Sequence, residues 1–407
     1  MKDGRVEFGD NPCLTRIEEK CTRCGLCKKT CDRIHGFDNE CIKCGQCILT
    51  CPMGAIVPKY DYQKVLNYLN DTEYKVIISI APASRVSLIN ELKLKGVDLT
   101  KKLVGLLRKV GFDYVYDIAV GADLTTVEES LELVERIKNN KFPLMTSCCP
   151  SWKNYAKNTN LDKYISTTKS PIKMQGYLVK NYVSKYVNFS DKVIHVLLMP
   201  CVSKKAEILD TDDIDFVITT RELLYMVNEA NIELSKIPES DFDPLLGNAT
   251  SSGIIFGTSG GVLESVLRTS YFLINNEQFP DNLKNKMLNN ALNFEECTYD
   301  FKKLKLNVAR VCGMNELKKL DLSKYHLVEV MACPGGCING GGQPLVPPNV
   351  FDEAKQLKSD LLVEIDKKTK LNNSYESKEI GDIYTFDIGQ PGGKEAHKKL
   401  HNEEKVN

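Results

Sequence analysis

The chain has 407 residues, enough for two or three domains with a sizeable core. Its 54 basic and 54 acidic residues cancel, which argues against a nucleic-acid partner or an anionic membrane surface. No run of about 18 apolar residues is present, and residues 1–7 lack the apolar core of a secretory signal. We therefore expect no membrane span and a cytoplasmic location.

The cysteine content is high for an intracellular chain, with 16 cysteines in all. Disulfide scaffolds are typical of short secreted domains, and this chain fits neither description. The cysteines are instead clustered at tight spacings. These spacings predict thiolates that hold metal.

Two runs of four cysteines between residues 21 and 51 each follow the spacing C-x2-C-x2-C-x3-C, and a proline follows the second run. In bacterial two-cluster ferredoxins with this spacing, the fourth cysteine of each run ligates the other cluster. The runs predict two 4Fe–4S clusters, one held by Cys21, Cys24, Cys27 and Cys51, the other by Cys41, Cys44, Cys47 and Cys31. Zinc knuckles are the alternative, but zinc sites seldom show this pattern twice. We interpret residues 1–58 as a small α+β ferredoxin-like domain.

Residues 59–345 alternate between apolar runs and helical patterns. Helices are predicted over residues 62–69, 99–110, 124–137 and 171–186, and strands over 74–80, 114–120, 193–199, 216–218, 306–311 and 327–332. Such alternation predicts an α/β domain with mostly parallel sheets. Thr219 is expected to cap a helix. The glycine-rich run 251–261 could cradle phosphate, but it has no Walker lysine, and we favour close backbone packing.

Three apolar runs end in cysteine. Residues 142–147 lead to Cys148 and Cys149, residues 193–200 to Cys201, and residues 325–330 to Cys333 and Cys337. Open α/β sheets place their sites beyond the carboxyl ends of strands, so we expect one shared pocket. The glycines after Cys333 would let a bulky group approach the backbone closely.

Cys148 and Cys149 are neighbours, and adjacent side chains of extended backbone point in opposite directions. Both therefore cannot easily ligate one cluster. Four thiolates remain, the number that a 4Fe–4S cubane requires: Cys149, Cys201, Cys333 and Cys337. Cys148 is then a spare thiol beside the metal, which suggests proton handling because a thiol pKa is tunable by its neighbours.

Three charged residues have both a functional and an ordinary interpretation. Glu129 and Glu132 share a helix face and could extend a proton relay towards solvent, although a solvated acidic face is the usual explanation. Lys204 follows Cys201 by three positions and could steady an anionic group on the metal, or it could be a surface lysine.

Residues 346–407 are polar. A helix is predicted over residues 353–366, followed by a surface strap and a charged, disordered tail.

The motifs TSCCPSW (146–152), MPCVSKKAE (199–207) and MACPGGC (331–337) closely resemble the three signature motifs of FeFe-hydrogenases. Residues 80–83, 122–125, 168–171 and 254–257 are similar to further segments of that family. Residues 392–401 resemble a segment that some members carry as a separate small subunit, which is here fused to the chain. The resemblance implies a catalytic domain of two lobes over residues 59–345 and a small-subunit-like segment over residues 346–407.

The resemblance also implies an H-cluster, in which a 4Fe–4S cubane is joined through one cysteine sulfur to a two-iron centre with CO, cyanide and a dithiolate bridge. Cys149, Cys201, Cys333 and Cys337 would hold the cubane, and Cys337 would bridge to the two-iron centre. Cys148 would pass protons to the bridge amine, followed by Glu129, Ser166 and Glu132. The side chains around the two-iron unit would be Lys204, Pro82, Ala83, Met199, Pro200, Phe256 and Met331.

The implied activity is the reversible reduction of protons to H2, with electrons relayed through two 4Fe–4S clusters to or from a ferredoxin-like carrier. Maturation proteins would supply the two-iron unit, and in a eukaryote the location would be an anaerobic organelle. Two alternatives share the fold. One is an H2 sensor, although no sensory domain is visible, and the other is a non-catalytic iron–sulfur assembly or carrier protein. Such an assembly protein is expected to lack Cys148 and Lys204, and this chain has both.

Overall fold

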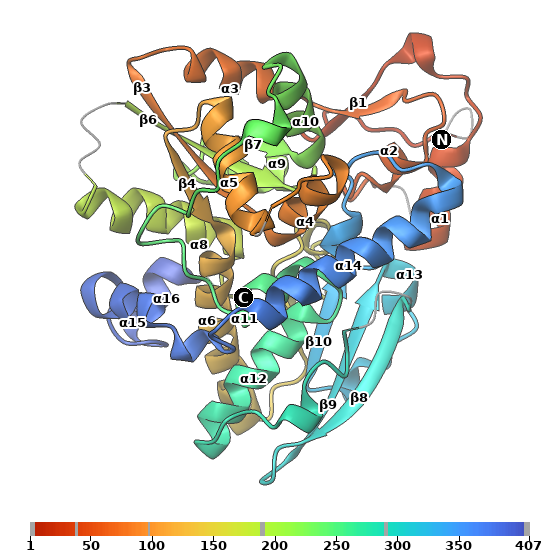
Figure 1. Ribbon diagram of the computed structural model, residues 1–407. Coiled ribbons are helices and arrows are strands. Elements are labelled where there is room, and N and C mark those ends of the chain that lie inside the picture. The colour runs from red at the N-terminus through yellow and green to blue at the C-terminus, as the bar shows by residue number, and fades with distance from the viewer. Residues whose placement is uncertain (1–4, 37–39, 97, 188–191, 289–291, 403–407) are drawn as a thin grey trace.

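The structure is a computed structural model that describes residues 5–36, 40–96, 98–187, 192–288 and 292–402. Figure 1 shows the N-terminal region beside two sheet-containing lobes, with the long helix α14 (Phe351–Lys368) lying across them. No helix among the described residues is long and apolar enough to cross a membrane.

The N-terminal region is a small α+β unit, as predicted. Its elements are β1 (Leu14–Arg16), α1 (Leu26–His35), α2 (Gln46–Thr50) and β2 (Ile56–Pro58), with β1 and β2 paired antiparallel. Each helix starts directly after a glycine in the left-handed conformation, Gly25 and Gly45, both at φ 75°. A glycine tolerates this angle without strain, so each cysteine run can turn sharply into a helix.

The first sheet has four parallel strands in the order β4-β3-β6-β7. The strands are β3 (Tyr74–Ile80), β4 (Tyr114–Asp117), β6 (Lys192–Met199) and β7 (Phe216–Thr219). Helices α3 (Tyr62–Leu69), α5 (Leu99–Val110) and α10 (Thr220–Glu229) supply apolar side chains to the core on one face. Thr219 caps α10 in a reciprocal pair with Glu222, which confirms the predicted cap.

The second sheet has the order β5-β10-β9-β8, with only β8 antiparallel to its neighbour. Its strands are β5 (Leu144–Met145), β8 (Phe294–Asp300), β9 (Lys305–Cys312) and β10 (Leu327–Met331), and α12 (Gly261–Asn275) packs on it. The mostly parallel sheets confirm the predicted α/β class. The sequence patterns missed β8 because it is an edge strand, only partly buried and carrying two glutamates.

The longest helix, α6 (Ile118–Lys138), lies between α8 (Pro171–Tyr177) and α12 and so joins the two lobes. The strand predicted over residues 114–120 was wrong at its end, because the chain turns into α6 at Asp117. The Asp117 carboxylate accepts the Ala119 backbone N–H and so caps the helix. The first half of α6 is buried on all sides, so its sequence has no polar face to reveal the helical period.

The helix predicted over residues 171–186 is helical throughout but changes type. It begins as α8, becomes a π-helix at Leu178–Tyr182 and ends as a 3-10 turn at Val183–Lys185. Helix α4 (Pro82–Glu91) was not predicted. It begins with proline at its first position, which is well suited to a helix start.

The C-terminal segment is more helical than the predicted strap. Helix α14 confirms and extends the helix predicted over residues 353–366. It is followed by α15 (Lys378–Ile383), a π-helix at Tyr384–Ile388 and α16 (Lys394–Leu400). Apolar side chains of these elements pack into the core that surrounds α6. Residues 403–407 of the predicted disordered tail lie outside the described residues.

Short helical segments complete the chain. The α-helices are α7 (Pro150–Ala156), α9 (Lys204–Glu207), α11 (Ser251–Ile254) and α13 (Met314–Leu317). The 3-10 helices are Glu18–Lys20, Asp162–Tyr164, Ile208–Asp210, Leu234–Lys236, Ile255–Gly257, Asp281–Leu283, Leu322–Lys324, Cys337–Asn339, Pro348–Val350 and Ser374–Glu376.

Candidate metal centre

Four cysteines come together at the carboxyl ends of strands from both sheets. Cys149 follows β5, Cys201 follows β6, Cys333 follows β10, and Cys337 opens a 3-10 turn. Burial raises the pKa of the last three thiols, and other thiols of the set raise it further. Such mutual influence requires short separations, so the four sulfurs share one largely buried pocket.

Four cysteine thiols in one pocket suit a 4Fe–4S cluster, because four cysteine thiolates are its usual ligands. Within the described ranges, no three His, Cys, Asp or Glu side chains converge tightly enough to hold one ion. Bound iron would also stabilise the thiolate forms that burial disfavours, since the thiolate is the form that ligates metal.

The glycine-rich loop after Cys333 approaches other backbone rather than open space. A Cβ added at Gly336, where φ is +83°, would lie 2.6 Å from the Ser259 nitrogen. At Gly340 the added atom would lie 2.4 Å from the Pro200 carbonyl oxygen. The positive φ angles of Gly335 and Gly336 also exclude a helix between the two cysteines. These glycines let the loop thread between the segments after β6 and before α12.

Cys148 lies beside the four thiols and is buried. Its side chain belongs to the same apolar cluster as Phe256 and Met331. Burial raises the pKa of Cys148 well above its usual range, and the nearby Cys337 and Glu129 raise it further. The thiol therefore keeps its proton at neutral pH, as a proton donor must.

Lys204 is buried, which excludes the surface-lysine interpretation. Its ammonium donates to the Cys148 carbonyl oxygen at 2.9 Å and pairs with Glu207 at 2.6 Å. Burial alone would lower the pKa of Lys204, but the ion pair with Glu207 outweighs it and the net shift is upward. The amine therefore stays charged next to the sulfur pocket.

The other residues predicted around the two-iron unit are also buried near the cysteines. Pro82 and Ala83 begin α4, Met199 is the last residue of β6, and Pro200 follows it. Gln343, which the sequence analysis missed, donates through Nε2 to the carbonyl oxygens of Ala83 at 3.0 Å and Cys337 at 3.4 Å. It therefore ties the first turn of α4 to the cysteine loop.

Glu129 lies on the buried part of α6, which rules out a solvated face for this residue. Its carboxylate accepts the Ser147 backbone N–H at 3.1 Å, and its second oxygen has no hydrogen-bond partner. Burial, and then the charge of Glu132, raise the pKa of Glu129 to about 8. A carboxyl with that pKa exchanges protons easily near neutral pH.

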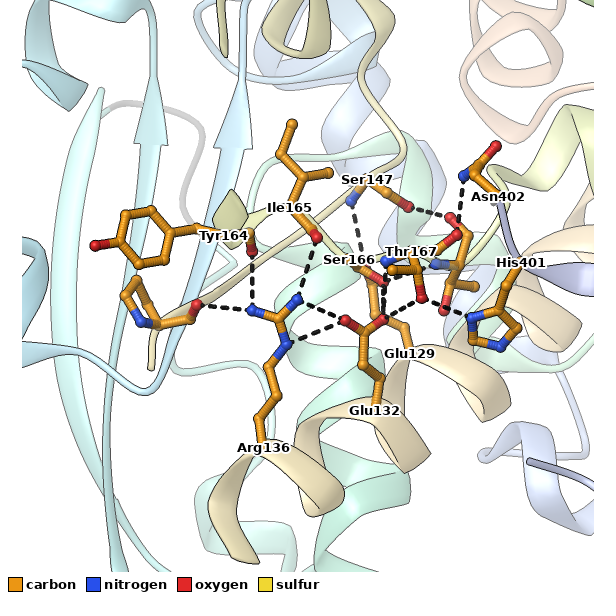
Figure 2. A network of polar contacts seen from close by, with 12 residues as sticks. Glu129, Glu132, Arg136, Ser147, Tyr164, Ile165, Ser166, Thr167, His401 and Asn402 are labelled. Carbon is orange, nitrogen blue, oxygen red and sulfur yellow. Dashed lines mark hydrogen bonds and ion pairs between the residues drawn. The ribbon is translucent and has the colours of Figure 1, made fainter. Parts of the chain in front are cut away.

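Glu132 lies one turn further along α6 and nearer the surface. It accepts the Ser166 hydroxyl at 2.7 Å and the Thr167 backbone N–H at 3.0 Å, and it pairs with Arg136 at 2.7 Å (Figure 2). The Ser166 hydroxyl also lowers the pKa of Glu129, so it lies close to that carboxyl as well. Glu129, Ser166 and Glu132 therefore lie in sequence from the pocket towards the surface.

The N-terminal cysteines form two further groups. Cys21, Cys24, Cys27 and Cys51 line one small cavity, together with Arg5, Arg16 and Met53. After burial, the thiols of Cys41, Cys31 and Cys27 contribute most to the raised pKa of Cys47. For Cys44, burial raises the thiol pKa most, and Cys333 and Cys31 then raise it further. The second group therefore lies between the first group and the core cysteines.

Comparison with known proteins agrees with this arrangement. The family model for the C-terminal domain of the iron-only hydrogenase large subunit matches residues 74–341. The model for the iron hydrogenase small subunit matches residues 352–403, and a 4Fe-4S binding domain matches residues 37–57. The chain belongs to the iron-only hydrogenase family.

Relatives within and around the iron-only hydrogenase family are named for different functions. Iron hydrogenase 1 of Clostridium pasteurianum is 36% identical over 95% of this chain and 75% of its own length. The cytosolic Fe-S cluster assembly factor narfl of Xenopus tropicalis is 30% identical over 83% of this chain and 77% of its own. The structure of an apo FeFe-hydrogenase from Chlamydomonas reinhardtii aligns with a TM-score of 0.71 at 31% identity, covering 84% of this chain and 98% of that one.

Motifs of the iron-only hydrogenase family did not reveal every residue at the site. Arg136, Thr167 and Glu207 contact residues that were predicted, and His401 contacts Thr167, but none of the four was singled out. Glu207 offered the clearest signal, because an acid three positions after a buried lysine on a helix is placed to pair with it. His401 gave no comparable signal, since its contacts come from distant parts of the chain.

Proposed function

We propose that this chain is a catalytic FeFe-hydrogenase that reversibly reduces two protons to H2 with two electrons. Cys149, Cys201, Cys333 and Cys337 would hold the 4Fe–4S cubane of an H-cluster. The bound cluster supplies the site at which protons and electrons combine. The residues of this chain bind it, exclude water and move protons.

One observation carries the proposal. Cys148 is a buried protonated thiol beside the four-thiol pocket, and Glu129, Ser166 and Glu132 follow it towards the surface. For H2 formation, the Cys148 thiol would release its proton into the pocket and regain one from Glu129. Glu129 is restored from Glu132 through the Ser166 hydroxyl. Each group in this sequence can both donate and accept a proton, as directional transfer requires.

Lys204 would hold the anionic side of the cluster. Its ammonium is buried and already oriented by Glu207 and by the Cys148 carbonyl oxygen. A lysine ammonium has three donors, so one remains for a negatively charged group in the pocket. Six apolar, buried residues would exclude water around that group. They are Pro82, Ala83, Met199, Pro200, Phe256 and Met331.

Electrons would travel through the N-terminal cysteine groups. Cys21, Cys24, Cys27 and Cys51 would hold the outer 4Fe–4S cluster, and Cys41, Cys44, Cys47 and Cys31 the inner one. Ferredoxin-type clusters reach about −0.4 V, and protons and H2 balance near the same potential at neutral pH. The outer group includes the exposed Cys24, so a ferredoxin-like carrier could dock nearby. The two-iron unit would come from dedicated maturation proteins.

A non-catalytic assembly factor is the second candidate, because relatives such as narfl match the chain almost as well as hydrogenases. A carrier needs the cubane cysteines but has no use for a buried free thiol continued by a carboxyl relay. Cys148, Glu129 and Lys204 therefore favour catalysis.

Infrared spectroscopy of the matured protein separates the two candidates. We expect bands of metal-bound CO and cyanide, together with H2 evolution driven by reduced methyl viologen. The matched control is Cys148→Ala, which keeps every proposed iron ligand. Absence of the infrared bands in protein matured with the dedicated enzymes, or a wild-type rate no higher than that of the control, would refute the proposal.

A further inference from the structure

The C-terminal segment places a histidine at the outer end of the relay. His401 follows α16, and its Nδ1 lies 2.8 Å from Thr167 Oγ1. The Thr167 Oγ1 lies 3.4 Å from Glu132 Oε2, the oxygen that also accepts the Thr167 backbone N–H. A single hydroxyl therefore separates the imidazole from the outer carboxyl (Figure 2).

The backbone holds this arrangement in place. Thr168 and His401 form an isolated antiparallel bridge. Asn402 donates to the Thr167 carbonyl oxygen through its backbone N–H at 2.7 Å and through its side chain at 2.9 Å. The imidazole and the hydroxyl thus have a fixed relative position, and only the protons between them need to move.

Glu128 fixes the tautomer of the neutral imidazole. Its carboxylate lies 3.0 Å from His401 Nε2 and also accepts the Tyr384 hydroxyl at 2.5 Å and the Gly392 backbone N–H at 3.1 Å. Because a carboxylate can only accept, Nε2 must carry a proton in both charge states of the histidine. The charge change of His401 therefore takes place at Nδ1, the atom that faces Thr167.

The Thr167 hydroxyl has one proton and two neighbours that can accept it. When Nδ1 carries no proton, the Thr167 hydroxyl donates its hydrogen bond to Nδ1 and cannot donate one to Glu132. When Nδ1 is protonated, it donates to Oγ1, and the hydroxyl proton turns to Glu132 Oε2. A protonated His401 thus gives Glu132 one more hydrogen bond and a nearby positive charge, and both favour the carboxylate form.

We propose that His401 is a positioning residue whose protonation turns the Thr167 hydroxyl towards Glu132 and so sets how readily Glu132 releases protons inward. This inference rests on the proposed function, in which Glu132 is the outer carboxyl of the relay. Imidazole changes charge within the physiological pH range. Acidic conditions therefore favour proton delivery and H2 formation, and alkaline conditions favour H2 oxidation.

Other titratable side chains lie around His401. His397 is exposed on α16 and stacks on His401, with ring centroids 4.4 Å apart. A cleft of about 710 Å³ opens in front of both rings. The remaining titratable side chains that line it are Glu128, Glu132, Glu135, Arg136, Lys141, Lys163 and Tyr164. Among the hydrogen bonds of the described residues, only Thr167 joins His401 to Glu132.

Histidine-selective NMR tests the coupling on protein that carries only 4Fe–4S clusters, so the result does not depend on hydrogen activity. The chain has five histidines, and His401→Gln assigns the signal. Coupling is reciprocal, so Glu132→Gln should lower the titration midpoint of His401 by about half to one pH unit. In a Thr167→Val background, the same change should shift the midpoint much less. An unchanged midpoint, or an equal shift in both backgrounds, would overturn the proposal.

The pH dependence of the two reaction directions provides the second readout. In the wild type, the ratio of the H2 evolution rate to the H2 oxidation rate should change between pH 6 and pH 8. We expect this change to be about 3- to 10-fold smaller in His401→Gln. His397→Gln removes a neighbouring imidazole without touching Thr167 and should follow the wild type. Identical profiles for wild type and His401→Gln would contradict the inference. If the protein neither evolved nor oxidised H2, the proposed function would be refuted. The NMR titration would still test the coupling between His401 and Glu132.

Discussion

The inner pocket and the outer relay differ in how the chain assembles them. The cysteines and Lys204 of the inner pocket lie within short segments directly after strands. The outer relay joins α6, the segment before α8 and the end of the chain, and its Glu128–His401 contact spans 273 residues. Short sequence motifs therefore specify the residues of the inner pocket. The residues of the outer relay come together only because three distant segments pack against one another.

This difference has an energetic side. The inner groups are desolvated, so each charge needs a partner, and removing that partner is costly. The outer groups border a cleft open to solvent, where water can replace a lost contact. We therefore expect substitutions to have steadily smaller effects from the pocket outward.

Glu129→Gln is expected to have the largest effect on activity. The amide cannot exchange a proton, so the relay from Cys148 is broken at a point that water does not reach. H2 evolution by matured protein should fall by about 100-fold or more. Glu135→Gln is the matched control, because Glu135 lies on the same helix but is exposed. A loss below tenfold, with infrared bands unchanged, would show that protons enter by another route.

Glu207→Gln tests the cost of breaking a buried ion pair. Lys204 would be left charged and unpaired next to the sulfur pocket, which should reduce the free energy of unfolding by about 3–5 kcal/mol. The control is Glu316→Gln, which breaks the more exposed Lys319–Glu316 pair, also three positions apart. This change should reduce the free energy of unfolding by only about 0–1 kcal/mol. Anaerobic urea unfolding measures both. Equal losses would mean that burial does not distinguish the two pairs.

Sequence patterns predicted the parts of the molecule that local chemistry specifies. The helices at residues 62–69 and 99–110 and the strand at 74–80 agree with the structure residue for residue. The patterns failed at Ile118, where burial on all sides hides the helical period, and at β8, where an edge strand carries polar residues. His401 was beyond their reach, because tertiary packing alone brings it to Thr167.

The raised pKa of Glu129 also predicts a pH-dependent stability. In the folded chain this carboxyl titrates at about 8, against an ordinary value of 4.5. The folded state therefore binds a proton that the unfolded state releases, and this stabilisation is lost as pH rises from about 4.5 to 8. Relative to Glu129→Gln, the wild type should lose up to about 1.4 kcal/mol per pH unit across that window. If the free energy of unfolding changed with pH in the same way in both proteins, Glu129 would not be the group that titrates in this window.

The smallest effect is expected at the surface end, for Arg136→Lys. The guanidinium donates to Glu132 from two nitrogens, at 3.1 and 2.7 Å, and also to the carbonyl oxygens of Pro143, Tyr164 and Ile165. Lysine keeps the charge but cannot make this planar set of contacts. Because the cleft admits water, we expect roughly a threefold loss of H2 evolution, equivalent to about 0.7 kcal/mol. A loss as large as that of Glu129→Gln would remove the distinction between a desolvated inner relay and a solvated outer one.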